Sequence, residues 1–180
     1  MRSIVAIDPG TIHTGIVKCE VSEEGGIVRV TDWSELEVPK GVAAPKRINA
    51  ILEQVVQWVD NVPFADEVWI EQFMFYGARK GAMHNAALVG ALAYLPATRQ
   101  REDLTTFVVP PVTWKSWYYK PFRERQATEY EVVEERLEEF GLLDPDLYRS
   151  MLNSQHIADA VGIALYSQYG DPNVDQTSPA

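Results

Sequence analysis

The sequence predicts an α/β protein: a five-stranded mixed sheet with helices on both faces. Two observations predict it. Apolar, β-branched runs end at turn signals, and the elements run in the order strand hairpin, helix, strand, helix, strand, helices. Strands joined through helices need crossover connections, which lay the helices against the sheet. The chain has 180 residues and is 46% hydrophobic, which suits one sizeable core. We assign residues 1–170 to this domain and expect residues 171–180 to form a flexible tail.

The first half of the chain predicts three strands and one helix. Residues 3–8 form an apolar run that is typical of a buried strand. Residues 14–21 and 27–33 flank the turn-forming stretch SEEGG, which predicts a hairpin. Residues 43–60 carry apolar side chains at helical spacing. They are therefore expected to form an amphipathic helix that packs on the sheet.

The centre of the chain alternates between strand and helix signals. Residues 67–73, EVWIEQF, predict a second buried strand. Residues 79–95 are rich in alanine and predict a helix that Pro96 ends. Residues 104–109, LTTFVV, are β-branched and aromatic, which favours a strand. These elements supply the crossovers that a mixed sheet needs.

The last third is mainly helical. Residues 112–126 predict a short helix or loop that is dense in aromatic and basic side chains. Residues 127–140 predict a very acidic helix with Gly141 at its C-terminal end. The stretch DPD that follows predicts a turn. Residues 154–168 predict a final helix with Ser154 as its N-cap.

Composition limits the class of protein. No apolar stretch reaches the ~18 residues that a membrane-spanning helix needs. The single cysteine, Cys19, excludes an internal disulfide and a cysteine-rich zinc site, and we expect it to be a packing residue. These features predict a cytoplasmic protein that does not bind membranes.

Charge is distributed unevenly along the chain. The net charge of −10 argues against nucleic-acid binding when it is taken alone. Residues 73–126, however, carry eight Lys and Arg residues against three acidic ones. This basic middle segment is a candidate for contacts with phosphates. For any single basic residue in it, a solvated surface position is the alternative.

Carboxylates occur where the predicted strands end. Asp8 ends the first strand, just before Pro-Gly, and Glu71 lies near the end of another. Active groups collect at such strand ends in α/β sheets. His156 and Asp159 are three residues apart on the final helix and therefore share one of its faces. We expect these four side chains to converge.

Such a cluster suits divalent cations. Adjacent carboxylates repel each other unless a cation lies between them, and oxygen ligands favour Mg²⁺ or Mn²⁺. Two such ions can activate a water and stabilise the leaving oxygen of a phosphodiester. Each residue also has a simpler alternative: Asp8 could start an Asx turn, Glu71 could form an ion pair, and His156 could be a surface residue. Asp159 lies within the apolar stretch IADAVGIAL, where an unpaired carboxylate is costly to bury.

The sequence resembles the RuvC family of Holliday-junction resolvases, within the ribonuclease H-like superfamily. The resemblance covers most of the chain from residue 4 to residue 166. It is carried by AIDPGTIHTGI, VWIEQFM, RKGAMHNAALVGALAYL and HIADAVGIALY. It implies a ribonuclease H-like fold. It also implies an endonuclease of recombination and repair that resolves four-way junctions by paired symmetric nicks, in a bacterial cell or a virus-infected bacterial host.

The resemblance also implies roles for the site residues. Asp8, Glu71 and Asp159 match the metal-binding motifs, and the family implies two Mg²⁺ or Mn²⁺ ions in each active site. His156 stands where the family commonly has aspartate, and its expected role is that of a metal ligand or of an acid or base. Lys115, in VTWK, resembles a family lysine that lies close to the scissile phosphate.

Junction DNA and a second copy of the chain are the implied partners. The family implies a homodimer, and we place its interface on the helix at 79–95, where small residues would allow close approach. The apolar area of this interface is expected from Leu88, Leu92 and Leu95. Phe73 or Phe75 is expected to wedge against the junction bases. The expected phosphate contacts are Arg79, Lys80, Lys115, Lys120, Arg123 and Arg125.

Three other functions are compatible with parts of the sequence. The stretch DPGT loosely fits the phosphate loop of actin-like ATPases and sugar kinases, although that class needs two lobes and a longer chain. A resolvase-like family associated with ribosomal RNA processing shares the opening motif. A non-catalytic junction-binding protein is the third, and the full set of acids argues against it. The sequence alone leaves cleavage preference, bacterial or phage origin and any branch-migration partner undetermined.

Overall fold

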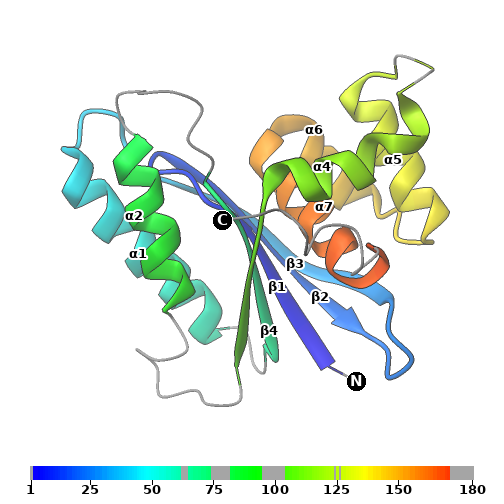
Figure 1. Ribbon diagram of the computed structural model, residues 1–180, viewed down its shortest axis with the longest axis horizontal. Helices are drawn as coiled ribbons and strands as arrows, with labels where there is room; N and C mark the ends of the chain where they lie inside the picture. The colour runs from blue at the N-terminus through cyan, green and yellow to red at the C-terminus, as the bar shows by residue number, and fades with distance from the viewer. Residues whose placement is uncertain are drawn as a thin grey trace, which may run out of the picture.

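The computed structural model describes residues 2–61, 65–73, 82–94, 104–123, 125 and 127–170. In this part of the chain, five strands form one sheet in the order β3-β2-β1-β4-β5, with helices on both sides (Figure 1). The strands are β1 (Arg2–Asp8), β2 (His13–Val21), β3 (Ile27–Glu37), β4 (Glu67–Glu71) and β5 (Thr105–Val109). The helices are α1 (Ala44–Asn61), α2 (Ala82–Ala93), α4 (Pro111–Tyr119), the short 3-10 helix η1 (Lys120–Phe122), α5 (Glu129–Glu139), α6 (Pro145–Asn153) and α7 (Gln155–Tyr169). The mixed α/β sheet that the sequence predicts is confirmed.

The sheet is mixed. Strands β1, β2 and β3 form an antiparallel meander, whereas β4 runs parallel to both β1 and β5. Ile7 of β1 is paired with Ile70 of β4. The next residue of each strand is a carboxylate, Asp8 or Glu71, so the register places both acids at one edge of the sheet.

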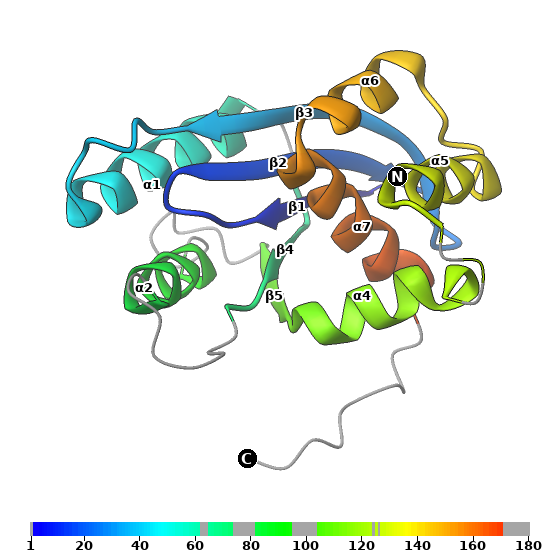
Figure 2. The ribbon, with the colours of Figure 1, turned by 90° about the horizontal axis from the view of Figure 1, so that it is seen from above.

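Strand β1 is buried on both faces because it lies in the middle of the sheet. Side chains alternate between faces along a strand. Ile4 and Ala6 accordingly belong to the core on one side, with α4 to α7, while Val5 and Ile7 belong to the core with α1 and α2. Figure 2 shows these two helical layers on opposite sides of the strands.

Helix α7 packs against β1 and β2 and is almost wholly apolar along that contact. Ser154 caps it, since its side chain accepts a hydrogen bond from the amide of Ile157. This confirms the predicted N-cap. The helix therefore begins at a fixed point beside the carboxyl ends of β1 and β4.

Helix α4 is held in place by a buried arginine. Arg136 of α5 is 5% exposed and donates hydrogen bonds to the carbonyl oxygens of Trp117 and Tyr118. Carbonyl groups in the last turn of a helix lack partners within the helix, and a cation there is favourable. The acidic helix α5 thus fixes the C-terminal end of α4, which carries Lys115 at its middle.

Two elements differ from the sequence prediction. Strand β3 continues to Glu37, four residues beyond the predicted end at residue 33. The predicted DPD turn is in fact the start of helix α6. Asp144 accepts hydrogen bonds from the amides of Asp146 and Leu147, and Pro145 occupies the first turn. These are helix-start signals, which the turn-forming residue types concealed.

The packing of helix α2 contradicts the prediction that its leucines supply the apolar area of a dimer interface. Leu88 and Leu92 are fully buried in the core that α1 and the sheet share, so they are not available to a second chain. By contrast, Met83 on this helix is 80% exposed, and Tyr94, which directly follows the helix, is 70% exposed. Leu95, the third leucine of that prediction, lies outside the described residues.

Cys19 is buried, and burial raises the pKa of its thiol to about 12. This confirms the packing role that the sequence predicts. No helix among the described residues is long and apolar enough to cross a membrane. The predicted tail, residues 171–180, lies outside the described residues.

Candidate active site

Three carboxylates meet at the edge of the sheet where β1 and β4 end. Asp8 is the last residue of β1, Glu71 is the last residue of β4, and Asp159 lies in the second turn of α7. One carboxylate oxygen from each lies within 4.8 Å of the other two. Asp8 and Asp159 are each 8% exposed. The predicted convergence of these acids is therefore seen in the structure.

A glycine allows α7 to reach this edge. Gly15 of β2 is paired with Asp8 in the sheet. A Cβ atom at Gly15 would lie 1.8 Å from the carbonyl oxygen of His156, a distance that real Cβ atoms do not adopt. Glycine at this position therefore brings the first turn of α7, and with it Asp159, against the end of β1.

The three carboxylates of the cluster repel one another. Burial, followed by the neighbouring carboxylate of Asp8, raises the pKa of Glu71 to about 7. The same two causes, in the same order, raise the pKa of Asp159. Like charges in a partly buried site favour protonation or the uptake of a cation. The site is therefore suited to a divalent ion.

Lys115 and Gln155 each donate a hydrogen bond to a different carboxylate oxygen of Asp159. The Lys115 ammonium donates to Oδ2 at 2.8 Å, and the Gln155 amide donates to Oδ1 at 2.9 Å. Burial alone would lower the pKa of Lys115, but the carboxylates of Asp159, Glu71 and Asp8 together raise it. The ammonium therefore stays charged, and its side chain is 39% exposed. It can meet a ligand that approaches the cluster from solvent.

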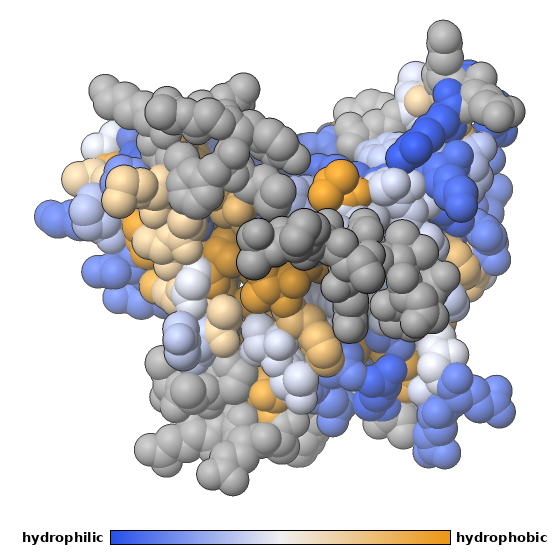
Figure 3. All heavy atoms as spheres, viewed as in Figure 1, coloured by the Kyte–Doolittle hydropathy of each residue, from blue (hydrophilic) through white to orange (hydrophobic). Residues whose placement is uncertain are grey.

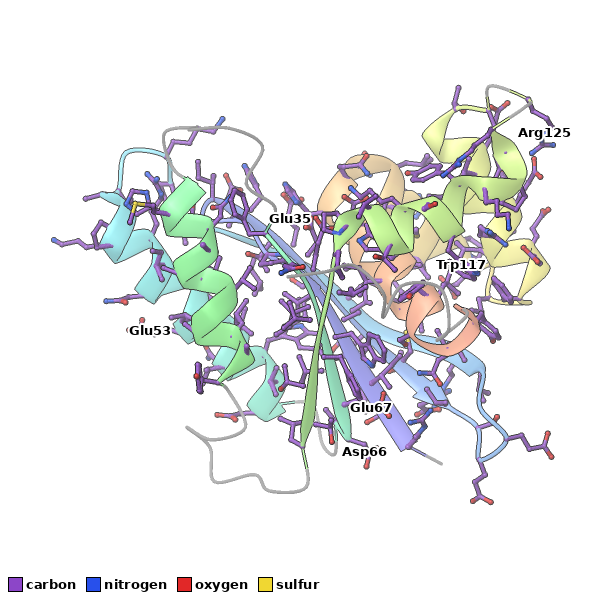
Figure 4. All side chains as sticks on the ribbon, viewed as in Figure 1. Glu35, Glu53, Asp66, Glu67, Trp117 and Arg125 are labelled. Carbon is purple, nitrogen blue, oxygen red and sulfur yellow. The ribbon has the colours of Figure 1, made fainter. Side chains whose placement is uncertain are left out.

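His156 pairs with Asp8. Its Nδ1 lies 2.6 Å from Asp8 Oδ2, and this hydrogen bond is the main cause that raises the pKa of the imidazole. The ring of His13 stacks on that of His156 at 5.7 Å between centroids, and His13 Nδ1 lies 2.7 Å from Glu35 Oε1. Figure 4 labels Glu35 at the end of the sheet beside the start of α4. A second layer of polar side chains from β2 and β3 therefore lies behind the pair of His156 and Asp8.

The donor set fits hard divalent ions. Three carboxylates offer oxygen ligands at one point, which Mg²⁺ and Mn²⁺ prefer over softer donors. Their mutual repulsion is the feature that a bound cation would relieve. Asp8, Glu71 and Asp159 are the residues that would hold such an ion.

The predicted DNA-contacting residues are only partly described. Phe73 is half-buried and packs on the core with α1 and α2. Lys120 and Arg123 are exposed near the end of α4, where Arg123 donates to the Ser116 hydroxyl. Arg125 makes two hydrogen bonds to Glu135, and both of these oxygen contacts are 2.8 Å long. Phe75, Arg79 and Lys80 lie outside the described residues.

Sequence reasoning missed four residues that line the cluster. His13 and Glu35 lie behind His156, Gln155 precedes it, and Trp114 donates its indole N–H to Glu71 Oε2 at 2.8 Å. Signals for two of them were available. His13 lies inside the opening motif, and Trp114 is adjacent to Lys115 in VTWK.

The fold is that of solved Holliday-junction resolvases. Thermus thermophilus RuvC, in complex with a Holliday junction substrate, is similar over 93% of this chain and 95% of its own, with a TM-score of 0.64 and 17% sequence identity. The yeast mitochondrial Holliday junction resolvase is similar over 89% of this chain and 75% of its own, with a TM-score of 0.66 and 12% identity. The fowlpox virus resolvase, in complex with Holliday junction DNA, covers 92% and 95%, with a TM-score of 0.54 and 12% identity.

Sequence comparison adds nothing to this likeness. The sequence matches no protein-family model, and no curated protein sequence matches it. At 12–19% identity, the similarity to the solved resolvases establishes the ribonuclease H-like α/β fold.

Proposed function

We propose that this protein is a metal-dependent endonuclease that resolves four-way DNA junctions by paired symmetric nicks in recombination and repair. The observation that carries the proposal is the meeting of Asp8, Glu71 and Asp159 within 4.8 Å at the strand ends. Support comes from the fold, which solved Holliday-junction resolvases share over most of the chain.

Asp8, Glu71 and Asp159 would hold two Mg²⁺ or Mn²⁺ ions in each active site. When bound, such ions activate a water for attack on the phosphodiester and stabilise the leaving oxygen. The three carboxylates come from two strands and one helix, all of them anchored in the core. The protein therefore fixes the positions of the ligands before substrate arrives.

Lys115 and His156 are proposed to act on the substrate side of the cluster. The partly exposed ammonium of Lys115 would contact a non-bridging oxygen of the scissile phosphate and offset its charge. His156 Nδ1 lies 2.6 Å from Asp8 Oδ2, so the imidazole is placed either to join the metal ligands or to exchange a proton close to them. Both side chains are more than one third exposed, unlike Asp8 and Asp159.

Binding of the junction is proposed to use the basic middle segment. Lys120 and Arg123 are exposed and follow α4, the helix that carries Lys115. Phosphate contacts of this kind supply most non-specific affinity and depend on salt. The remaining predicted contacts, Arg79, Lys80 and Arg125, belong to the same proposal, as do the wedge roles of Phe73 and Phe75.

A homodimer is the proposed active form, because two opposed strands must be cut with fixed geometry. A two-fold dimer presents two identical sites. The exposed residues here are Met83 and Ala87 on α2 and Tyr94 directly after it. Figure 3 shows hydrophobic side chains over α2 and the neighbouring β5, where Phe107 and Val108 are 37% and 41% exposed. We place the interface on this surface in place of the buried leucines.

The dimer is tested by sedimentation of the purified protein at micromolar concentration. We expect twice the monomer mass of 20.3 kDa for the wild type and the monomer mass for Ala87→Arg. Val28→Arg is the matched control, because Val28 is 49% exposed on β3, away from α2. A wild-type monomer that still makes paired nicks would contradict the dimer.

The activity is tested by offering the protein a four-way junction, a fork, a linear duplex and a structured RNA, each with and without Mg²⁺. We expect paired symmetric nicks in the junction alone, and only with the metal. Asp8→Asn should bind the junction without cutting it, because affinity comes mainly from basic side chains. Cleavage of the RNA alone would favour the ribosomal-RNA alternative. Binding without cleavage by the wild type would favour a non-catalytic junction-binding protein.

A further inference from the structure

Trp114 is fully buried and lies beside the carboxylate cluster. It lies on α4 and donates its N–H to Glu71 Oε2 at 2.8 Å. The ammonium of Lys115 lies 4.9 Å from the centre of its ring, which is within the range of a cation–π contact. One side chain therefore touches both a proposed metal ligand and the proposed phosphate-binding cation.

The opposite edge of the indole rests on α7. A Cβ atom at Gly162 would lie 2.4 Å from Trp114 Cζ3 and 3.2 Å from Cε3, so the ring occupies the space that any larger residue would need. Gly162 follows Asp159 by three residues and thus lies on the same side of α7. The indole is therefore clamped between Glu71 and the helix that supplies Asp159.

The chemistry of the indole suits a supporting role for a metal ligand. Its N–H is a donor only, so it can orient a carboxylate but cannot replace it as a ligand. Groups that hydrogen-bond to ligating carboxylates fix their orientation, and their loss weakens metal binding. A rigid ring also has few rotamers to lose, which makes it a precise support.

We propose that Trp114 is a positioning residue that fixes the Glu71 carboxylate for metal binding and holds Lys115 beside it. The inference rests on the proposed function, because it assumes that Glu71 is a metal ligand. It adds a residue from outside the predicted site, and it gives the glycine at position 162 a role in the geometry of that site.

Trp117 provides a matched control on the same helix. It lies three residues after Trp114, is half-buried, and packs edge-on against Tyr166 at 5.8 Å with Arg136 at 4.8 Å from its ring centre. Figure 4 labels it on the part of α4 farther from Glu35. Replacing either tryptophan with phenylalanine removes an indole from α4, but only Trp114→Phe removes a hydrogen bond to the cluster.

The first test measures Mn²⁺ binding in the absence of DNA, by electron paramagnetic resonance, for the wild type, Trp114→Phe and Trp117→Phe. Circular dichroism confirms that each variant is folded. We expect about a 10- to 100-fold loss of affinity for Trp114→Phe and about twofold or less for Trp117→Phe. Equal affinities in all three proteins would overturn the positioning role alone. A wild type that binds no Mn²⁺ would overturn the proposed function, and this role with it.

The second test uses the wild type only, so it does not depend on the stability of a variant. Mg²⁺ is titrated into the protein while the assigned indole N–H resonances are followed by nuclear magnetic resonance. We expect the resonance of Trp114 to shift with the metal and that of Trp117 to stay in place, because only the first is bonded to a ligand carboxylate. An unmoved Trp114 resonance in a protein that binds Mg²⁺ would overturn the proposal.

A third test approaches the indole from its other edge. Gly162→Ala should push the ring away from Gly162 and so disturb its bond to Glu71. We expect it to weaken Mn²⁺ binding, and we expect the double variant with Trp114→Phe to bind no more weakly than the weaker single variant. Residues that act through one contact show such non-additivity. Fully additive losses would mean that position 162 does not act through Trp114.

Discussion

Strand β4 begins and ends with a glutamate, and the surroundings of the two side chains are opposite in charge. Glu67 accepts hydrogen bonds from the Arg2 guanidinium and from the indole of Trp69, which lies at 2.8 Å. Glu71 also accepts an indole N–H at 2.8 Å, from Trp114. Beside it, however, are two further carboxylates, Asp8 and Asp159. Figure 4 labels Glu67 at the end of the sheet opposite Glu35.

The difference shows that a carboxylate's role depends on its neighbours. Glu67 has an arginine of its own and so joins β1 to β4. At the other end, among the described residues, three carboxylates share one lysine and one histidine. Burial, followed by the charge of Asp8, raises the pKa of Glu71 to about 7. An excess of negative charge held by a rigid scaffold costs stability, and it is retained where it binds cations.

We expect the two glutamates to respond very differently when each is neutralised. We expect Glu71→Gln to lower junction cleavage by about 10³-fold or more, because a metal ligand supports several kcal/mol of transition-state stabilisation. Glu67→Gln should leave cleavage unchanged and cost about 1 kcal/mol of folding stability. Single-turnover cleavage and urea denaturation measure the two quantities. Similar cleavage rates for both variants would show that the two ends do not differ in function.

Removing the cationic side chain at either end of β4, Lys115 or Arg2, should have a smaller effect than neutralising the glutamates. Lys115→Met should slow cleavage by about 10²-fold, since the charge that faces the phosphate is lost. Arg2→Met should cost at most about 1 kcal/mol of stability, because the Arg2 side chain is 42% exposed, and it should not affect cleavage. Cleavage at wild-type rate by Lys115→Met would show that this lysine only pairs with Asp159 and does not act on the phosphate.

The pH dependence of stability should also distinguish Glu71 from Glu67. The folded-state pKa of Glu71 is about 7, against 4.5 for the free group, so the folded protein binds more protons than the unfolded chain between these values. Stability of the metal-free protein should therefore fall as pH rises from about 4.5 to 7, by about 2–3 kcal/mol from this group. The raised pKa values of Asp159 and His156 act in the same direction.

Urea denaturation in EDTA at several pH values measures this slope. Glu71→Gln should flatten it, and Glu67→Gln should not. Adding Mg²⁺ above pH 7 should restore stability to the wild type, because a ligand that binds only the folded state stabilises it. A stability that rises between pH 5 and pH 7 without metal would contradict the electrostatic picture of the cluster.

The smallest expected effect comes from the two indoles that bond to the glutamates. Trp69→Phe should cost about 1 kcal/mol of stability through the lost hydrogen bond, since the phenyl ring can keep the stacking on Phe107. It should leave Mn²⁺ affinity unchanged, in contrast to Trp114→Phe. Denaturation and metal titration of both variants make the comparison. Equal Mn²⁺ affinities in the two variants would show that Trp114 has no more influence on metal binding than Trp69 has.

Local sequence pattern was enough to predict several parts of the site. Asp8 and Glu71 each end an apolar strand, and the strand signal is contained within a few neighbouring residues. His156 and Asp159 share a helical face because of their spacing alone. Helix capping by Ser154 and the burial of Cys19 follow from similarly local chemistry. These features were predictable because strand and helix periodicity decides them.

Contacts between side chains from distant parts of the chain depend on how the elements pack. The bond from Trp114 to Glu71 spans 43 positions, and the pair of His13 and Glu35 forms only because β2 and β3 bring those residues together. Helix α2 has little contrast between its faces in sequence, so the burial of Leu88 and Leu92 depended on how the helix is rotated against the sheet. Periodicity fixes which residues share a face of an element. Only packing among distant elements fixes what that face contacts, because that choice depends on shape and charge contributed by the rest of the chain.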